Sequence, residues 1–122
     1  ILKSSYEHEK EYLVSVNKPL TAQFLKKMSE GVPILDTITK PCHVEAVDKT
    51  TFRIILTQGL NRQIRRMCET LDYRVTQLKR IRIMNIHLGR LKPGTYRNLT
   101  DWELEELKLE LTQNLDPHNK NF

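Results

Sequence analysis

Residues 10–16 read KEYLVSV, and this stretch, together with the segment that follows it, decides the fold. Its tyrosine and its two valines recur at every second position, a pattern that predicts a strand with one buried face. Thr21 then provides an N-cap for a predicted helix, which Gly31 ends. A strand followed closely by a capped helix predicts a layer of sheet covered by helices.

The rest of the chain continues this alternation of short strands and helices. Residues 31–41 are rich in turn-forming residues and are expected to be a loop. Beyond it the pattern predicts strands at 43–47 and 52–57, a helix at 62–71, a strand at 75–88, and a final helix that begins at a Thr100–Glu103 capping box. This order predicts the α+β class, with a mostly antiparallel mixed sheet and helices packed on it. Residues 113–122 are expected to form a polar C-terminal tail.

Composition excludes several classes of protein. The chain has 122 residues, of which 39% are hydrophobic and 29% charged, the balance of a soluble globular domain. No apolar run approaches the roughly 20 residues that a membrane span requires. Two cysteines, Cys42 and Cys68, cannot make a disulfide framework, and four scattered histidines make a metal site improbable.

Positive charge is concentrated in the middle of the chain. Residues 53–92 contain ten basic and two acidic side chains, whereas the net charge of the whole chain is +5. A basic region flanked by neutral and acidic segments is typical of a protein that binds a polyanion. Solvation of an ordinary surface is the alternative, and charge alone leaves it open.

Residues 59–67, GLNRQIRRM, are the least ordinary stretch. They place Arg62, Arg65 and Arg66 in the first turns of a predicted helix, where the macrodipole already makes cations unfavourable. A bound anion would reverse the sign of that effect. A solvated helix face would explain Arg62 and Arg66 equally well. It fits Arg65 less well, because Arg65 falls at the edge of the buried stripe, where an arginine usually holds a carboxylate or a phosphate.

Residues 79–83, KRIRI, alternate so that Arg80 and Arg82 share one face of a strand while Ile81 and Ile83 are expected to face the core. The two arginines are interpreted as phosphate contacts, with a charged outer sheet face as the alternative. By pattern alone, Tyr12 is a half-buried aromatic residue of the sheet.

Four stretches together carry a resemblance to a known family. They are KEYLV at 10–14, GLNRQIRRMC at 59–68, LKRIRI at 78–83 and YRNLT at 96–100. In this order they resemble the bacterial ribosomal RNA pseudouridine synthases, in the branch typified by the small-subunit pseudouridine synthase A. Within that branch, residues 31–40 and 59–69 are most similar to enzymes that act on the large ribosomal subunit.

The resemblance implies a cytoplasmic enzyme that isomerises uridine to pseudouridine in ribosomal RNA without a cofactor or a metal. An aspartate nucleophile acts on a flipped-out nucleotide in this family. By position in the motifs, Tyr12 would stack on the target base and could serve in proton removal, and Arg65 would pair with the nucleophilic carboxylate. The two are therefore expected at one concave site. The RNA backbone would be held by the remaining arginines of the motifs: Arg62, Arg66, Arg80 and Arg82.

One element of the family's pattern does not occur in this sequence. The nucleophile of the family lies in an Arg-Leu-Asp motif followed by Gly-Leu, and no such run is present. Residues 1–112 are therefore expected to be the C-terminal portion of a pseudouridine synthase catalytic domain, inactive on its own. A non-catalytic RNA-binding module remains the alternative.

Overall fold

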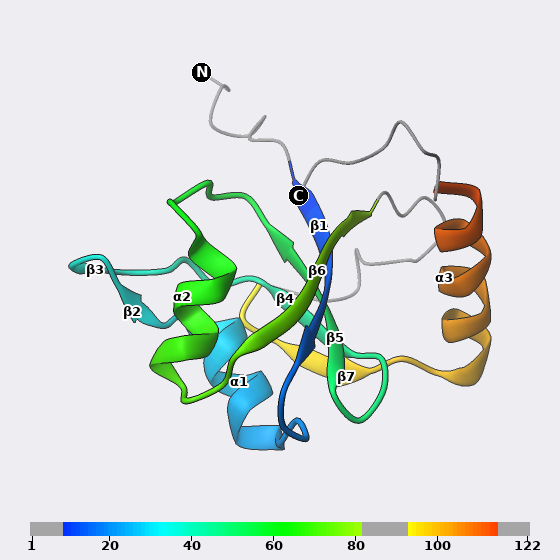
Figure 1. Cartoon of the computed structure of the whole chain (residues 1–122), viewed down its shortest axis with the longest axis horizontal. Helices are drawn as coiled ribbons and strands as arrows, with labels where there is room; N and C mark the ends of the chain where they lie inside the picture. Colours follow the sequence, from blue (N-terminus) through cyan, green and yellow to red (C-terminus); the bar gives the residue numbers. More distant parts are fainter. Residues whose placement is uncertain (1–8, 82–92, 115–122) are drawn as a thin grey trace.

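The computed structural model describes residues 9–81 and 93–114. Their centre is a five-stranded sheet crossed on one side by two helices, with a third helix lying apart from them (Figure 1). All neighbouring strands are antiparallel except the last pair, which is parallel. The strands in spatial order are β6 (Val75–Ile81), β1 (Lys10–Val16), β5 (Thr51–Leu56), β4 (His43–Ala46) and β7 (Tyr96–Asn98). The α+β class is confirmed.

Helix α1 (Ala22–Glu30) has the ends that its sequence predicts. The Thr21 hydroxyl accepts a hydrogen bond from the Phe24 amide at 3.0 Å, which satisfies one of the free N–H groups of the first turn. Gly31 ends the helix with a φ of 131°, and a Cβ there would lie 2.7 Å from the Thr39 carbonyl oxygen. Only glycine fits this position.

A small hairpin, β2 (Pro33–Ile34) and β3 (Thr37–Ile38), occupies the segment expected to be a loop. Its tip is formed by Leu35 and Asp36, both with positive φ (47° and 63°). Two consecutive left-handed residues are the geometry of a tight hairpin turn that usually carries Asn-Gly. A Leu-Asp tip lacks that signal, and the sequence pattern therefore missed the hairpin.

The two faces of the sheet differ in what covers them. The helix face, on which Tyr12, Val14 and Ile54 lie, packs against α1 and α2 (Gln63–Thr70) and contains the main hydrophobic core. The opposite face, the ion-pair face, carries Glu11 and Arg53, because successive side chains of a strand alternate between faces.

The expectation that Ile81 faces the core and Arg80 the opposite side of β6 is wrong. Arg80 is the register partner of Tyr12, so it lies on the helix face, on the same side as the core residues. Ile81 is buried but pairs with Glu11 on the ion-pair face, outside the main core. Leu78 lies on the helix face and packs against the core. Arg80, two residues later on the same face, is exposed. The continuation of this strand towards residue 88 lies outside the described residues.

The C-terminal helix begins as its sequence predicts. The Glu103 amide donates to the Thr100 hydroxyl at 3.2 Å, and the Thr100 amide donates to Glu103 Oε1 at 3.1 Å. This reciprocal pair is a capping box. Helix α3 (Asp101–Asn114) includes the first residues of the segment expected to be a tail.

Candidate active site

A cavity of about 360 Å³ opens on the helix face beside the start of α2. This volume lies within the range of small-ligand pockets. It is bounded by strands β1 and β6, the end of β5, and the loop between β5 and α2. The lining residues are Tyr12, Leu56, Gln58, Gly59, Leu60, Arg62, Gln63, Ile64, Arg65 and Leu78.

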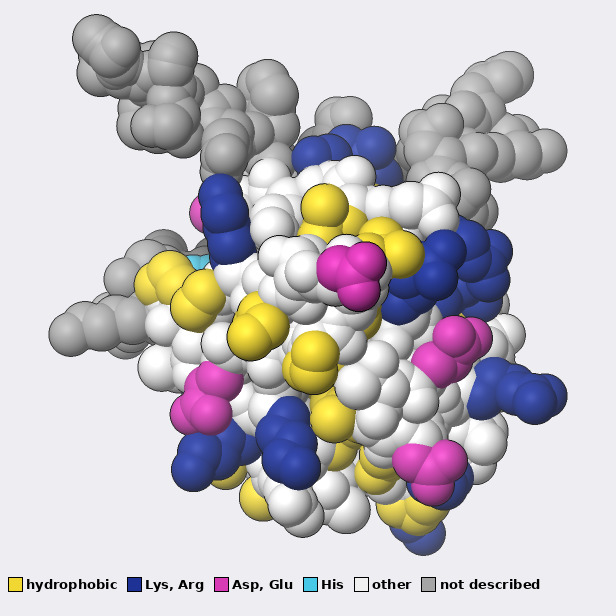
Figure 2. Space-filling view, turned by 90° about the vertical axis from the view of Figure 1, so that its left-hand side faces the viewer, with side chains coloured by type: hydrophobic (Ala, Val, Ile, Leu, Met, Phe, Trp, Pro, Cys, Tyr) yellow, Lys and Arg dark blue, Asp and Glu magenta, His cyan; other side chains and the backbone are white. Residues whose placement is uncertain are grey.

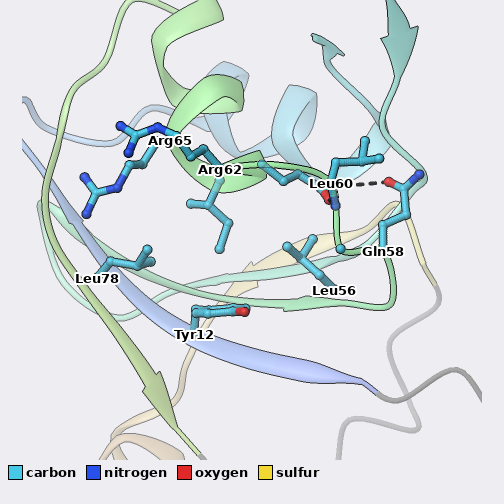
Figure 3. Close-up of a pocket in the computed structure, with 10 residues that line it drawn as sticks. Tyr12, Leu56, Gln58, Leu60, Arg62, Arg65 and Leu78 are labelled. Carbon is cyan, nitrogen blue, oxygen red and sulfur yellow. Dashed lines mark hydrogen bonds between the residues drawn. The ribbon is translucent and has the colours of Figure 1, made fainter. Parts of the chain in front are cut away.

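Tyr12 and Arg65 meet in this cavity although they belong to distant elements. Tyr12 comes from the middle of β1, and Arg65 comes from the first turn of α2. The side chains of Arg62 and Arg65 extend to the same side of the cavity, with Tyr12 across from them (Figure 3). A flat aromatic ring facing two guanidinium groups can hold a planar base that carries a phosphate.

The start of α2 adds to the positive potential of the cavity. Arg62 is the N-cap residue, in the left-handed conformation, and its side chain makes no capping hydrogen bond. The first turn contains no acidic residue. Among the described residues neither Arg62 nor Arg65 forms an ion pair with a carboxylate. Because the helix dipole and the arginines have the same sign here, an anion is the favourable occupant.

Two further cations lie beside the cavity on the helix face. Arg80 is exposed and directly opposite Tyr12 across the β1–β6 pair. Lys10 is two positions before Tyr12 on the same face, and its Nζ lies 3.9 Å from the point that a Cβ on Gly59 would occupy. The sequence analysis missed Lys10. The sequence could have indicated it, because residues two positions apart in a strand share a face and Lys10 is two positions before Tyr12.

Arg66, another of the predicted RNA contacts, does not line this cavity. Arg66 lies on the next turn of α2, where its Nε donates to the Asn61 carbonyl at 3.0 Å and its Nη2 donates to Asn61 Oδ1 at 2.9 Å. It faces a separate hollow beside the hairpin. Arg82 lies outside the described residues.

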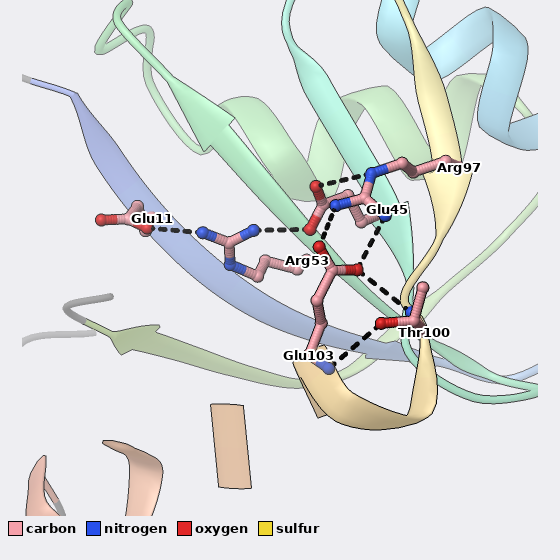
Figure 4. A network of polar contacts seen from close by, with 6 residues as sticks. All are labelled: Glu11, Glu45, Arg53, Arg97, Thr100 and Glu103. Carbon is pink, nitrogen blue, oxygen red and sulfur yellow. Dashed lines mark hydrogen bonds and ion pairs between the residues drawn. The ribbon is translucent and has the colours of Figure 1, made fainter. Parts of the chain in front are cut away.

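The ion-pair face carries a chain of charged side chains that the sequence analysis did not anticipate (Figure 4). Arg53, only 1% exposed, donates to Glu45 at 2.6 Å and to Glu11 at 2.9 Å. Glu45 is also buried, and its second oxygen lies 3.6 Å from Arg97 Nε. Burial raises the pKa of Glu45, while the two neighbouring guanidinium groups act in the opposite direction. Arg53 is thus neutralised inside the protein and adds nothing to a polyanion surface.

The chain of ion pairs ends at the capping box of α3. Arg97 donates two hydrogen bonds to Glu103, at 2.7 and 2.6 Å. These bonds hold the pKa of Glu103 at about 2, well below its ordinary 4.5. A bidentate pair of this kind fixes the orientation of both groups. Helix α3 is therefore tied to the ion-pair face through β7.

The described residues offer neither a metal site nor a reactive thiol. It contains no cluster of three metal-ligating side chains. Cys42 and Cys68 are buried, and burial raises the pKa of each thiol to about 12, so neither is a thiolate at neutral pH. No helix in these residues is long and apolar enough to cross a membrane.

The side of the molecule that presents α2 and the hairpin carries both apolar and basic groups. Hydrophobic side chains lie across its middle, and Lys and Arg side chains gather towards one edge (Figure 2). Leu35 and Ile38 of the hairpin are among the exposed large hydrophobic residues. The largest group of basic side chains on this side lies at that edge, and further ones are scattered over its lower part and its upper edge (Figure 2).

Comparisons with known proteins place this cavity in context. No family model matches the chain. It is 55% identical over 107 residues to the dual-specificity RNA pseudouridine synthase RluF of Salmonella typhi, covering 88% of this chain and 37% of that relative. It is 33% identical over 99 residues to the ribosomal small subunit pseudouridine synthase A of Yersinia pestis, covering 79% of this chain and 42% of that one.

A solved structure has a similar fold and a lower sequence identity. The crystal structure of a pseudouridylate synthase superimposes with a TM-score of 0.62 and 28% identity, over 88% of this chain and 48% of that chain. The chain thus spans less than half the length of each of these three proteins. Over most of its own length, this chain is a homologue of the RNA pseudouridine synthases of the RluF and small-subunit synthase A type.

Proposed function

We propose that this chain is part of an RNA pseudouridine synthase that isomerises a specific uridine in ribosomal RNA, with the large subunit as the preferred source. The observation that supports it is the meeting of Tyr12 and Arg65 in one cavity. Their separation in sequence, from β1 to α2, makes a chance meeting of these two motif residues improbable. The relatives named above add independent support.

The proposed reaction needs a flat surface and an ionised carboxylate. The bond between C1′ of the ribose and N1 of uracil breaks, and C1′ then joins C5. C5 gives up its hydrogen as a proton, and N1 takes up a proton, so the product is an isomer of the substrate. No oxidant or reductant takes part. Tyr12 would stack on the flipped base, and Arg65 would keep a nucleophilic aspartate ionised by lowering its pKa. That aspartate lies in a motif that this sequence does not contain.

The RNA backbone would be held by the cations around the cavity. Arg62 lines it, Arg80 lies across from Tyr12, and Lys10 lies beside its loop wall. Phosphate contacts of this kind position the RNA without reading its sequence. They also release counterions, so binding should weaken steeply as salt rises.

Tritium release from 5-tritiated uridine in ribosomal RNA tests the proposal. We expect the full-length protein to release tritium and the isolated 122-residue chain to release none. In the full-length protein, Arg65→Ala should lower the rate of the chemical step by about 100-fold or more, the usual scale for losing an electrostatic contact in an active site. Its RNA affinity should change far less. Arg62→Ala should mainly weaken binding.

A full-length protein without tritium release would contradict the proposal. Equal losses of rate and affinity in Arg65→Ala would remove Arg65 from the chemical step and leave it an RNA contact.

A further inference from the structure

The wall of the cavity between β5 and α2 is a short loop that needs external support. The loop wall, residues 58–62, contributes Gln58, Gly59, Leu60 and Arg62 to the cavity lining. Arg62 has φ 48° and ψ 39°, the left-handed region that non-glycine residues rarely adopt. A residue in such a conformation persists only where its surroundings hold it there.

One buried side chain bonds to the loop wall at two points. Gln63 is 4% exposed. Its Oε1 accepts from the Leu60 amide at 3.3 Å, and its Nε2 donates to Gln58 Oε1 at 3.2 Å. That same oxygen of Gln58 accepts from the Lys40 amide at 3.0 Å, which joins the loop wall to the segment after the hairpin. Figure 3 shows Gln58 with its bond at the edge of the cavity.

A second side chain holds the loop wall from outside the cavity. Arg66 donates to both the backbone carbonyl and the side-chain oxygen of Asn61. The Asn61 side chain is therefore engaged by Arg66 rather than free to turn into the cavity's loop wall. The loop wall is thus held by Gln63 from within and by Arg66 from outside, on either side of Arg62.

We infer that Gln63 is a positioning residue of the RNA site, whose buried amide holds the loop wall so that Arg62 is presented to the cavity. The inference rests on the proposed function, since RNA is the ligand that Arg62 would meet. Glutamine suits the position because it supplies an acceptor for Leu60 and a donor for Gln58 at once. Methionine would fill similar space and supply neither bond.

A double-mutant cycle in the full-length protein separates this role from a merely structural one. The probe is a fluorescein-labelled RNA stem-loop with a uridine in its loop, and the affinities compared are those of wild type, Gln63→Met, Arg62→Ala and the double variant. If Gln63 acts through Arg62, Gln63→Met alone should weaken binding by at least about twofold, and the double variant should be little weaker than Arg62→Ala. If Gln63 has only a structural role, the losses of RNA affinity in Gln63→Met and Arg62→Ala should multiply in the double variant.

Ser29→Ala is the matched control. The buried Ser29 hydroxyl lies within hydrogen-bond distance of the Lys26 and Gly94 carbonyl oxygens, and none of these three residues lines the cavity. Its loss should lower stability without changing RNA affinity. If Gln63→Met does not fold, Gln58→Ala removes the other end of the same bond. Its loss of RNA affinity should then also fail to multiply with that of Arg62→Ala.

Each outcome is decisive. Wild-type protein that binds neither the stem-loop nor ribosomal RNA would refute the proposed function. Wild-type binding with losses that multiply, or Gln63→Met affinity equal to wild type, would overturn the role of Gln63 and leave the proposed function standing.

Discussion

The two faces of the sheet use arginine in opposite ways. On the helix face, Arg62 and Arg65 line a cavity and have no carboxylate partner among the described residues. On the ion-pair face, Arg53 is fully buried between two glutamates. The cavity arginines and the buried Arg53 contribute equally to the net charge of residues 53–92. Only burial and partners separate an arginine that is available for an external anion from one that holds the fold together.

The largest effect we expect comes from breaking the ion-pair face. Arg53→Met would leave Glu45 buried without its closest cation, which typically lowers the free energy of unfolding by about 3–5 kcal/mol. Arg62→Ala, an exposed residue with no ion pair among those described, should stay within about 0.5 kcal/mol of wild type. Urea denaturation followed by circular dichroism measures both. Equal losses in the two variants would erase the distinction between the faces.

A smaller effect concerns the pH dependence of stability. Arg97 holds the pKa of Glu103 at about 2 in the folded protein, against an ordinary value of 4.5. A lowered carboxylate pKa stabilises the folded state above the ordinary value, and this contribution is lost as pH falls towards the folded value. Wild type should therefore lose free energy of unfolding more steeply below pH 4.5 than Glu103→Gln. Parallel pH profiles would show that the pair contributes nothing.

The smallest effect we expect is a difference between Arg62 and Arg66 in how strongly RNA binding depends on salt. Arg66 already donates to Asn61, so it offers less to a phosphate than Arg62 does. Arg66→Ala should therefore change the slope of log affinity against log salt by less than the roughly one unit expected for Arg62→Ala. Fluorescence anisotropy with labelled RNA at several salt concentrations gives both slopes. An Arg66→Ala slope change as large as that of Arg62→Ala would make Arg66 a direct contact.

Local rules predicted the elements whose signals are local. Strand β1, the Thr21 cap, the Gly31 stop and the capping box at Thr100 each depend on residues within a few positions of one another. β7 was missed because three residues gain strand geometry only by pairing with β4, more than fifty positions earlier.

Site residues that belong to a recognisable sequence motif could be predicted. Residues whose importance comes from contacts in the folded protein could not. Tyr12 and Arg65 were expected together, and they line one cavity. Gln63 was not singled out, because its bonds to Leu60 and Gln58 depend on the fold of the loop before it. Arg53 looked like surface charge, although it lies in a strand beside the register positions of Glu45 and Leu13. Pairing between strands, which the sequence does not reveal, buries it.

One matched pair of variants tests most directly whether the helix face is the RNA face. Arg80 and Lys79 are neighbours on β6 whose side chains point to opposite faces, with Arg80 opposite Tyr12 and Lys79 opposite Leu13. The measurement is the slope of log RNA affinity against log salt for wild type, Arg80→Ala and Lys79→Ala. We expect Arg80→Ala to flatten the slope by about one unit and Lys79→Ala to leave it unchanged. A change in Lys79→Ala with none in Arg80→Ala would place the RNA on the ion-pair face and contradict the account.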